Sequence, residues 1–225
     1  MGRVRNPFPP TWALADLLEH LGDISPRRIR LRPAPGKAEE RHVIAILERE
    51  NRLYELTEGV LVEKIMGYEE LSLACELIYY LKHFLRENDL GNVAGADGCL
   101  RLMPGLVRIP DISYVSWDRL PERRMPDEAL PDLTPDLAVE ILSEGNTPRE
   151  MDRKMRDYFF AGTRLVWYIE PQRRCVRVYT SPDQCVERNE SQTLDGGTVL
   201  PGFALPLGQL FRHLPGAKSR RKRKK

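Results

Sequence analysis

A short apolar run with a single acid inside it constrains this chain more than any other segment: Leu137-Ala138-Val139-Glu140-Ile141-Leu142. Such a run is typical of a central strand covered on both faces, as in α/β and α+β folds. An acid in a strand of this kind is costly to bury unless something compensates its charge. Glu140 therefore requires a partner from elsewhere in the chain.

The order of the other segments predicts a mixed β-sheet flanked by helices, an α/β (α+β) fold. The expected strands cover residues 53–56, 60–65, 99–102, 107–115, 137–142, 165–169 and 175–179, with Gly59 in a hairpin turn. Long helices are expected over 68–87 and from Asn146 or Thr147, the candidate caps, to Gly162, and a short one over 207–211. Before them we expect a helix capped by Thr11, a linker over 26–36 and a helix over 38–50.

Length and composition favour one compact domain with extensions. The chain has 225 residues, of which 41% are hydrophobic. We expect an N-terminal helical appendage with a linker over residues 1–46, a main domain over 47–212 and a disordered tail over 213–225. There is no apolar run of membrane-spanning length and no signal region, which predicts a cytoplasmic protein without a membrane partner. The spacing of the cysteines and histidines argues against a zinc site.

The net charge of +2 hides an asymmetry between the body of the chain and its end. Seven basic residues fall in the last eight, which leaves 28 basic and 33 acidic residues, a formal charge of −5, for the rest. The tail is a candidate for sequence-independent contacts to nucleic-acid phosphates, and a solubilising end is an equally good interpretation. The tail residues concerned are Lys218, Arg220, Arg221, Lys222, Arg223, Lys224 and Lys225.

Two acids and one lysine form a candidate metal site. Asp111 follows Pro110, Glu140 lies in the apolar strand, and Lys154 lies on the next helix, one turn before Tyr158. Two carboxylates that hold a divalent ion, with a charged helper, are the groups that phosphodiester hydrolysis requires. Each residue also has an ordinary interpretation: Asp111 could start a strand, Glu140 could pair with a lysine, and Lys154 could be solvated.

Other acids nearby are weaker candidates. Glu70, beside Glu69, is in the usual case a surface residue. Glu55 and Glu63 lie in the hairpin, where each could line the same cleft or face water.

Together these segments resemble the Uma-type family of restriction endonuclease-like proteins, members of the PD-(D/E)xK nuclease superfamily. The resemblance covers roughly residues 47–211. It is carried by Tyr54–Leu61, Ile109-Pro110-Asp111, Pro135–Ser143, the helix with Lys154 and Tyr158, and Ala161–Pro171.

The resemblance implies a four-stranded mixed sheet with the active site at the edge of two neighbouring strands. Asp111 and Glu140 take the two acidic positions of the superfamily motif, and the carbonyl of Ile141 is a third metal ligand. The motif lysine is absent, because Leu142 stands in its place, and Lys154 on the following helix replaces it. Glu70 takes the position of a further acid, and Tyr158 supports the lysine or contacts phosphate.

The leading hypothesis is therefore an endonuclease that hydrolyses DNA phosphodiester bonds with Mg²⁺, or with Mn²⁺ in its place. A homodimer is compatible with this activity. The alternative is a catalytically silent protein of the same fold that binds nucleic acid or another partner. An enzyme acting on a different phosphoester is a third hypothesis.

Overall fold

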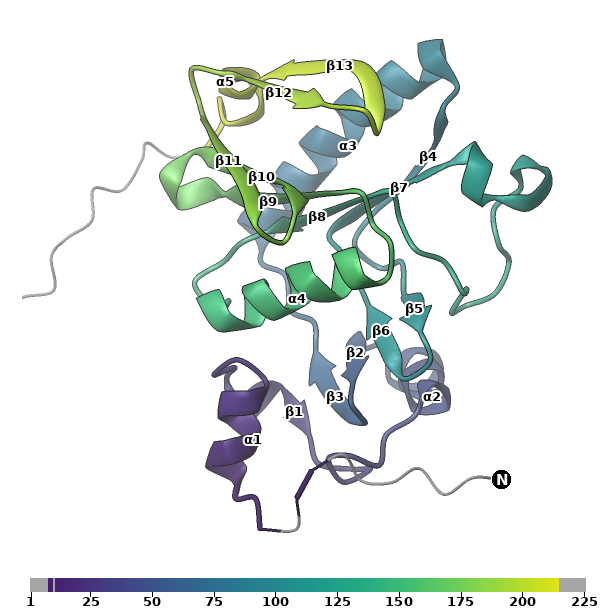
Figure 1. Ribbon diagram of the computed structural model, residues 1–225, viewed down its shortest axis with the longest axis vertical. Coiled ribbons are helices and arrows are strands. Elements are labelled where there is room, and N and C mark those ends of the chain that lie inside the picture. The colour runs from purple at the N-terminus through teal and green to yellow at the C-terminus, as the bar shows by residue number, and fades with distance from the viewer. Residues whose placement is uncertain (1–7, 10, 215–225) are drawn as a thin grey trace, which may run out of the picture.

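The computed structural model describes residues 8–9 and 11–214, and its architecture is the mixed α and β fold that the sequence predicts. A six-stranded sheet forms the centre, with helices on both faces, and a five-stranded sheet lies beside it (Figure 1). A two-stranded sheet near the C-terminal end completes the structure. The basic residues 218–225, which we predict to bind nucleic acid, lie outside the described residues.

The central sheet has the strand order β11-β10-β9-β8-β7-β4, in which β8 and β9 are parallel and the other neighbours antiparallel. Its inner strand β8 is buried along its whole length, as the apolar run predicts. The sheet has two more strands than the four that the family resemblance implies. The strands are β4 (Gly91–Ala94), β7 (Ile112–Ser116), β8 (Leu137–Ile141), β9 (Leu165–Glu170), β10 (Cys175–Ser181) and β11 (Gln184–Asn189).

Side chains alternate between the two faces of β8, and this alternation places Glu140. Leu137, Val139 and Ile141 pack in a core with helix α3 (Tyr68–Asn88), the hairpin β12 (Thr193–Gly196) and β13 (Leu200–Pro206), and helix α5 (Leu207–Leu210). Ala138 packs on the opposite face, against helix α4 (Pro148–Phe160). Because the period of a strand is two residues, Glu140 also points toward α4.

Helix α4 begins where the sequence predicts. Thr147 is its N-cap and accepts a hydrogen bond from the backbone N–H of Glu150 at 3.0 Å, and Pro148 is the first helical residue. Two of its buried residues, Glu150 and Lys154, carry a charge. The buried residues fall at helical spacing and are Glu150, Met151, Lys154, Met155 and Tyr158. Lys154 is therefore held against the central sheet and not in solvent.

A proline divides the segment 107–115, which we predicted to be one strand. The structure has two strands there, β6 (Leu106–Arg108) and β7, and they belong to different sheets. Pro110 lies between them and has no N–H to continue a ladder, so the chain leaves one sheet and enters the other at this point.

The second sheet has the order β1-β3-β2-β6-β5 and contains the predicted hairpin. Helix α2 (Glu40–Glu50) covers it through a shared apolar core. Its strands are β1 (Ile29–Arg30), β2 (Tyr54–Thr57), β3 (Val60–Glu63), β5 (Leu100–Met103) and β6.

The N-terminal segment differs from the expectation at two places. Helix α1 (Leu14–His20) has Ala13 at its N-cap, so Thr11 does not cap it. The segment 26–36, expected to be a linker, contains strand β1, which pairs with β3. The segment is thus a structural part of the second sheet.

Hydrogen bonds and ion pairs fasten this N-terminal segment to α4. The hydroxyl of Thr147 donates a hydrogen bond to the carbonyl of Gly22, and Arg153 donates one to the carbonyl of His20 at 2.8 Å. Arg28 and Glu150 form a nearly buried ion pair at 2.8 Å. Within the described residues no helix has the length and apolarity needed to cross a membrane.

We predict that Gly22→Ala lowers the free energy of unfolding by more than Gly105→Ala does. Gly22 has a φ of +89°, and a Cβ there would lie 2.5 Å from the backbone nitrogen of Glu150. Gly105 has a similar φ of +80° but open space around it, so it isolates the cost of the backbone conformation, about 1 kcal/mol. Chemical denaturation measures both. Equal losses would contradict close docking of this segment on α4.

Candidate active site

Asp111 is fixed where the ladder between β7 and β8 ends. Ile112 pairs with Val139 in this antiparallel ladder, and Asp111 precedes it directly. The Oδ2 atom of Asp111 accepts a hydrogen bond from the backbone N–H of Ile141 at 2.6 Å. The side chain thus continues the pairing by one step, which leaves Oδ1 free to make other contacts.

Glu140 is the centre of the site, with only 3% of its surface exposed. Its Oε1 receives the Lys154 ammonium and the Tyr158 hydroxyl, each at 2.7 Å. Lys154 and Tyr158 lie four residues apart on α4, so they reach the same oxygen from successive turns. The structure therefore brings Glu140, Lys154 and Tyr158 together as the sequence pattern suggests.

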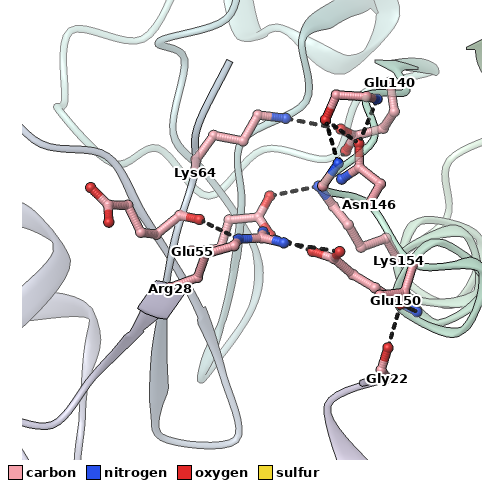
Figure 2. A network of polar contacts seen from close by, with 12 residues as sticks. Gly22, Arg28, Glu55, Lys64, Glu140, Asn146, Glu150 and Lys154 are labelled. Atoms are coloured by element: carbon pink, nitrogen blue, oxygen red, sulfur yellow. Dashed lines mark hydrogen bonds and ion pairs between the residues drawn. The ribbon is translucent and has the colours of Figure 1, made fainter. Parts of the chain in front are cut away.

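A second lysine, Lys64, joins the two acids, and no pattern in the sequence singled it out. Its Nζ lies 2.7 Å from Asp111 Oδ1 and 2.9 Å from Glu140 Oε2 (Figure 2). Lys64 follows strand β3 directly, and its backbone N–H donates a hydrogen bond to the carbonyl of Leu53 at 2.9 Å. It reaches the acids from the second sheet, a contact that depends on how the two sheets meet.

Glu55 on β2 extends the network on the side away from Lys64. Its Oε1 accepts from Lys154 at 2.9 Å and from the backbone N–H of Ile109 at 3.2 Å. Its Oε2 lies 3.0 Å from Arg108, which also pairs with Asp157. Glu55 thus lies within the site, whereas Glu63, the other hairpin acid, pairs with Arg52 at the margin of the sheet.

Burial and charge pairing set the protonation of these groups. Burial acts to raise the pKa of Glu140, but Lys154 and Lys64 outweigh it and hold that pKa below its ordinary value. The same balance, with Lys154 and Arg108 as the cations, lowers the pKa of Glu55. The pKa of Lys64 is raised, because its burial is outweighed by Glu140 and Asp111. Glu140, Glu55 and Lys64 are therefore charged at neutral pH.

Two groups of the site hold their protons more tightly than usual. Burial raises the pKa of Asp111 above its ordinary value, even though Lys64 acts in the opposite direction. Burial beside Glu140 raises the pKa of Tyr158 well above its ordinary value, so this phenol remains a donor.

The acids form the floor of a cleft of about 580 Å³, within the usual range for ligand sites. Asp111, Glu140, Lys64 and Lys154 line its floor. The N-terminal segment contributes Ser25, Arg27 and Arg28 to its lining, and residues 141–146 also line it. Glu70 lines the cleft from α3 but, among the described residues, is not in the hydrogen-bonded network of the acids and lysines.

The two acids fit a hard divalent cation. Asp111 Oδ1 and Glu140 Oε2 converge on one positive charge, the Lys64 ammonium, which here stands where a cation would be held. Among the described residues no three His, Cys, Asp or Glu side chains converge as a metal site. Mg²⁺ in proteins commonly uses one or two carboxylates, with water and substrate oxygens completing the shell, so two acids suffice.

The mixed sheet and helices that carry these acids and lysines match the fold of a nuclease-like protein. Residues 39–208 match the model of the Uma2 family, described as "Putative restriction endonuclease". Because the match covers most of the chain, this protein belongs to the Uma2 family, as the sequence resemblance predicts.

A solved structure supports the fold. The chain is similar to the crystal structure of a "putative nuclease belonging to DUF820" from Anabaena variabilis ATCC 29413, with a TM-score of 0.65 and 19% sequence identity. The similarity covers 73% of this chain and 93% of that one. A comparison with curated proteins found no match.

We predict that Lys154→Met destabilises the fold by roughly 3–5 kcal/mol, because it leaves two buried carboxylates, Glu55 and Glu140, without their shared cation. Arg156→Met on the same helix removes an exposed pair with Asp152 and is the matched control, with little expected effect. Denaturant unfolding followed by circular dichroism compares the two. A similar small change in both would show that the network contributes little to stability.

Proposed function

We propose that this protein is a divalent-metal-dependent endonuclease that hydrolyses phosphodiester bonds in DNA. The observation that carries the proposal is the convergence of Asp111 and Glu140 on one cation position at the floor of an open cleft. The family and the solved neighbour, both described as nucleases, support the nuclease class.

Asp111 and Glu140, with the backbone carbonyl of Ile141, would hold Mg²⁺ or Mn²⁺. The bound ion supplies an activated water and stabilises the charge that develops on the phosphoryl oxygens. Asp111 is oriented by the Ile141 N–H, and Glu140 is oriented by Lys154 and Tyr158. One oxygen of each acid is therefore fixed by these donors, and the other oxygen of each contacts the Lys64 ammonium.

We propose that Lys154 replaces the absent motif lysine, in an unusual setting. Only 3% of its surface is exposed, and its ammonium is shared by Glu55 and Glu140. From this position we propose that it keeps Glu140 ionised and aligned, and that it reaches the attacking water through the cleft that it lines. Glu70, on the wall of the same cleft, is proposed as an accessory acid.

Arginine side chains on the wall of the cleft could contact a nucleic-acid strand. Arg27 is exposed on its wall, where a guanidinium can meet a substrate phosphate. One site per chain cuts one strand, so we propose that cleavage of a duplex uses a homodimer.

We predict that the purified protein cleaves plasmid DNA with Mg²⁺ or Mn²⁺, and that Asp111→Asn reduces cleavage by at least about 100-fold, because a ligand charge is lost without a change of shape. Asp183→Asn, in an exposed turn, is the matched control and should retain full activity. Agarose gels follow the conversion of supercoiled plasmid. Cleavage that persists in folded Asp111→Asn would come from a contaminant or another site, and would overturn the assignment.

One observation favours the alternative, a silent protein of the same fold that binds nucleic acid. Each acid of the site already pairs with a cation of the protein. Under that alternative, the basic tail would supply the DNA affinity.

If this alternative holds, we predict that deletion of residues 218–225 weakens binding to a fluorescent DNA duplex at low salt by about ten-fold or more, because about seven phosphate contacts are lost. A tail of the same length in which serine replaces each Lys and Arg is the control for length. Fluorescence anisotropy measures both over a range of salt. Unchanged affinity at low salt would place the DNA contacts on the folded domain, as the nuclease proposal requires of its cleft.

A further inference from the structure

Lys64 lies between the two proposed metal ligands, and it comes from the end of β3, whereas Lys154 comes from α4. Its ammonium lies within 2.9 Å of an oxygen of each acid, and its side chain is 10% exposed (Figure 2). Lys154, in contrast, contacts Glu140 and Glu55 but no oxygen of Asp111 among the described contacts. Among residues 8–9 and 11–214, Lys64 is therefore the one lysine that binds the pair of oxygens that a metal would use.

The acids of the buried network already have cations of the protein beside them. Glu55, Asp111 and Glu140 pair with Lys64, Lys154 and Arg108, and Arg108 also pairs with the less buried Asp157. A divalent ion added to this group would meet a full positive charge at contact distance from its own ligands. The ion and the Lys64 ammonium cannot share the same two oxygens, so one of them must leave.

We propose that Lys64 is a built-in counter-cation that occupies the metal position in the free protein, and that a divalent ion displaces its ammonium into the cleft, where it meets a substrate phosphate. This inference rests on the metal site proposed above and adds a competing group to it. Without metal, Lys64 thus positions the oxygens of Asp111 and Glu140. With metal bound, it contacts a substrate phosphate.

The surroundings of Lys64 permit this movement. Residues 64–67 have no regular secondary structure and join β3 to α3, and Lys64 lines the open cleft. Its four-carbon side chain can redirect the ammonium without a change in the backbone. Lys154 also lines the cleft, but it and Arg108 are each about 3% exposed and are each held between two acids of the protein, so both are more tightly held than Lys64.

Two properties follow from this exchange. Without metal, Lys64 prevents repulsion between Asp111 and Glu140 and keeps their oxygens convergent. With metal, its release lowers the apparent affinity for the ion by the free energy of the lost ion pairs. A substrate phosphate that binds the released ammonium then favours metal binding, and the two ligands are coupled through one side chain.

Binding of Mn²⁺, measured from the electron paramagnetic resonance signal of the free ion, tests the inference without any DNA cleavage. We predict that Lys64→Met binds Mn²⁺ at least about ten-fold more tightly than wild type, because the competing charge is gone, whereas Lys64→Arg keeps the charge and the weak binding. Lys37→Met, at an exposed lysine, is the control and should match wild type. Asp111→Asn should lose the site.

The outcomes separate the two proposals. Equal Mn²⁺ affinity in wild type and Lys64→Met would overturn the role of Lys64 and leave the metal site intact. If Mn²⁺ binds no variant, or binds Asp111→Asn as well as wild type, the metal site itself is wrong and both proposals fail.

Chemical labelling of the wild-type protein gives a second test that requires no folded variant. Acetylation of lysines, followed by mass spectrometry, should show Lys64 protected without metal and modified several-fold faster with saturating Mg²⁺. Lys154 should remain protected in both states, and Lys37 should be modified equally in both. A Lys64 rate that Mg²⁺ does not change would overturn the displacement.

Discussion

The structure depends on the compensation of one buried charge, that of Glu140 in the middle of the central sheet. Every neighbour of Glu140 along β8 is apolar. The free-energy cost of an unpaired carboxylate there would be comparable to the whole free energy of unfolding of a typical domain. Three donors offset this cost: Lys64, Lys154 and Tyr158. Each donor comes from an element outside the sheet that holds the acid, so the charge can be buried only when those elements are correctly placed.

The same requirement explains why the site lies where the two sheets meet. The central sheet supplies Glu140 and, at the start of β7, Asp111, whereas the second sheet supplies Glu55 and, at the end of β3, Lys64. Pro110 marks the passage of the chain between the sheets. Helix α4 closes the remaining side, and the N-terminal segment fastens that helix through its first turns. The ion pairs that stabilise the fold thus involve the same carboxylates that would bind the metal. Lys64 and a metal ion are therefore proposed to compete for the oxygens of Asp111 and Glu140.

Local patterns predicted much of this fold, and their failures have physical reasons. The cap at Thr147 and the apolar run of β8 depend on residues close in sequence, so both were recognised. Strand β11 was missed because most of its side chains are exposed and carry no apolar alternation. The break at Pro110 was missed because the strands on either side of it read as one apolar run, and only their partners distinguish the two sheets.

Some features of the candidate site also follow from local sequence, and others depend on tertiary packing. Burial of Glu140 follows from its apolar neighbours, and the shared face of Lys154 and Tyr158 follows from helical spacing, so sequence periodicity alone determines them. No local pattern marks Lys64, which reads as an ordinary charged residue after a strand. Its contact with Asp111 and Glu140 joins residues 47 and 76 positions apart, and such pairs depend on how β3 and the central sheet are packed. Tertiary structure therefore decided which cation lies between the acids, because ion pairing depends on distance in space and leaves no period in the chain.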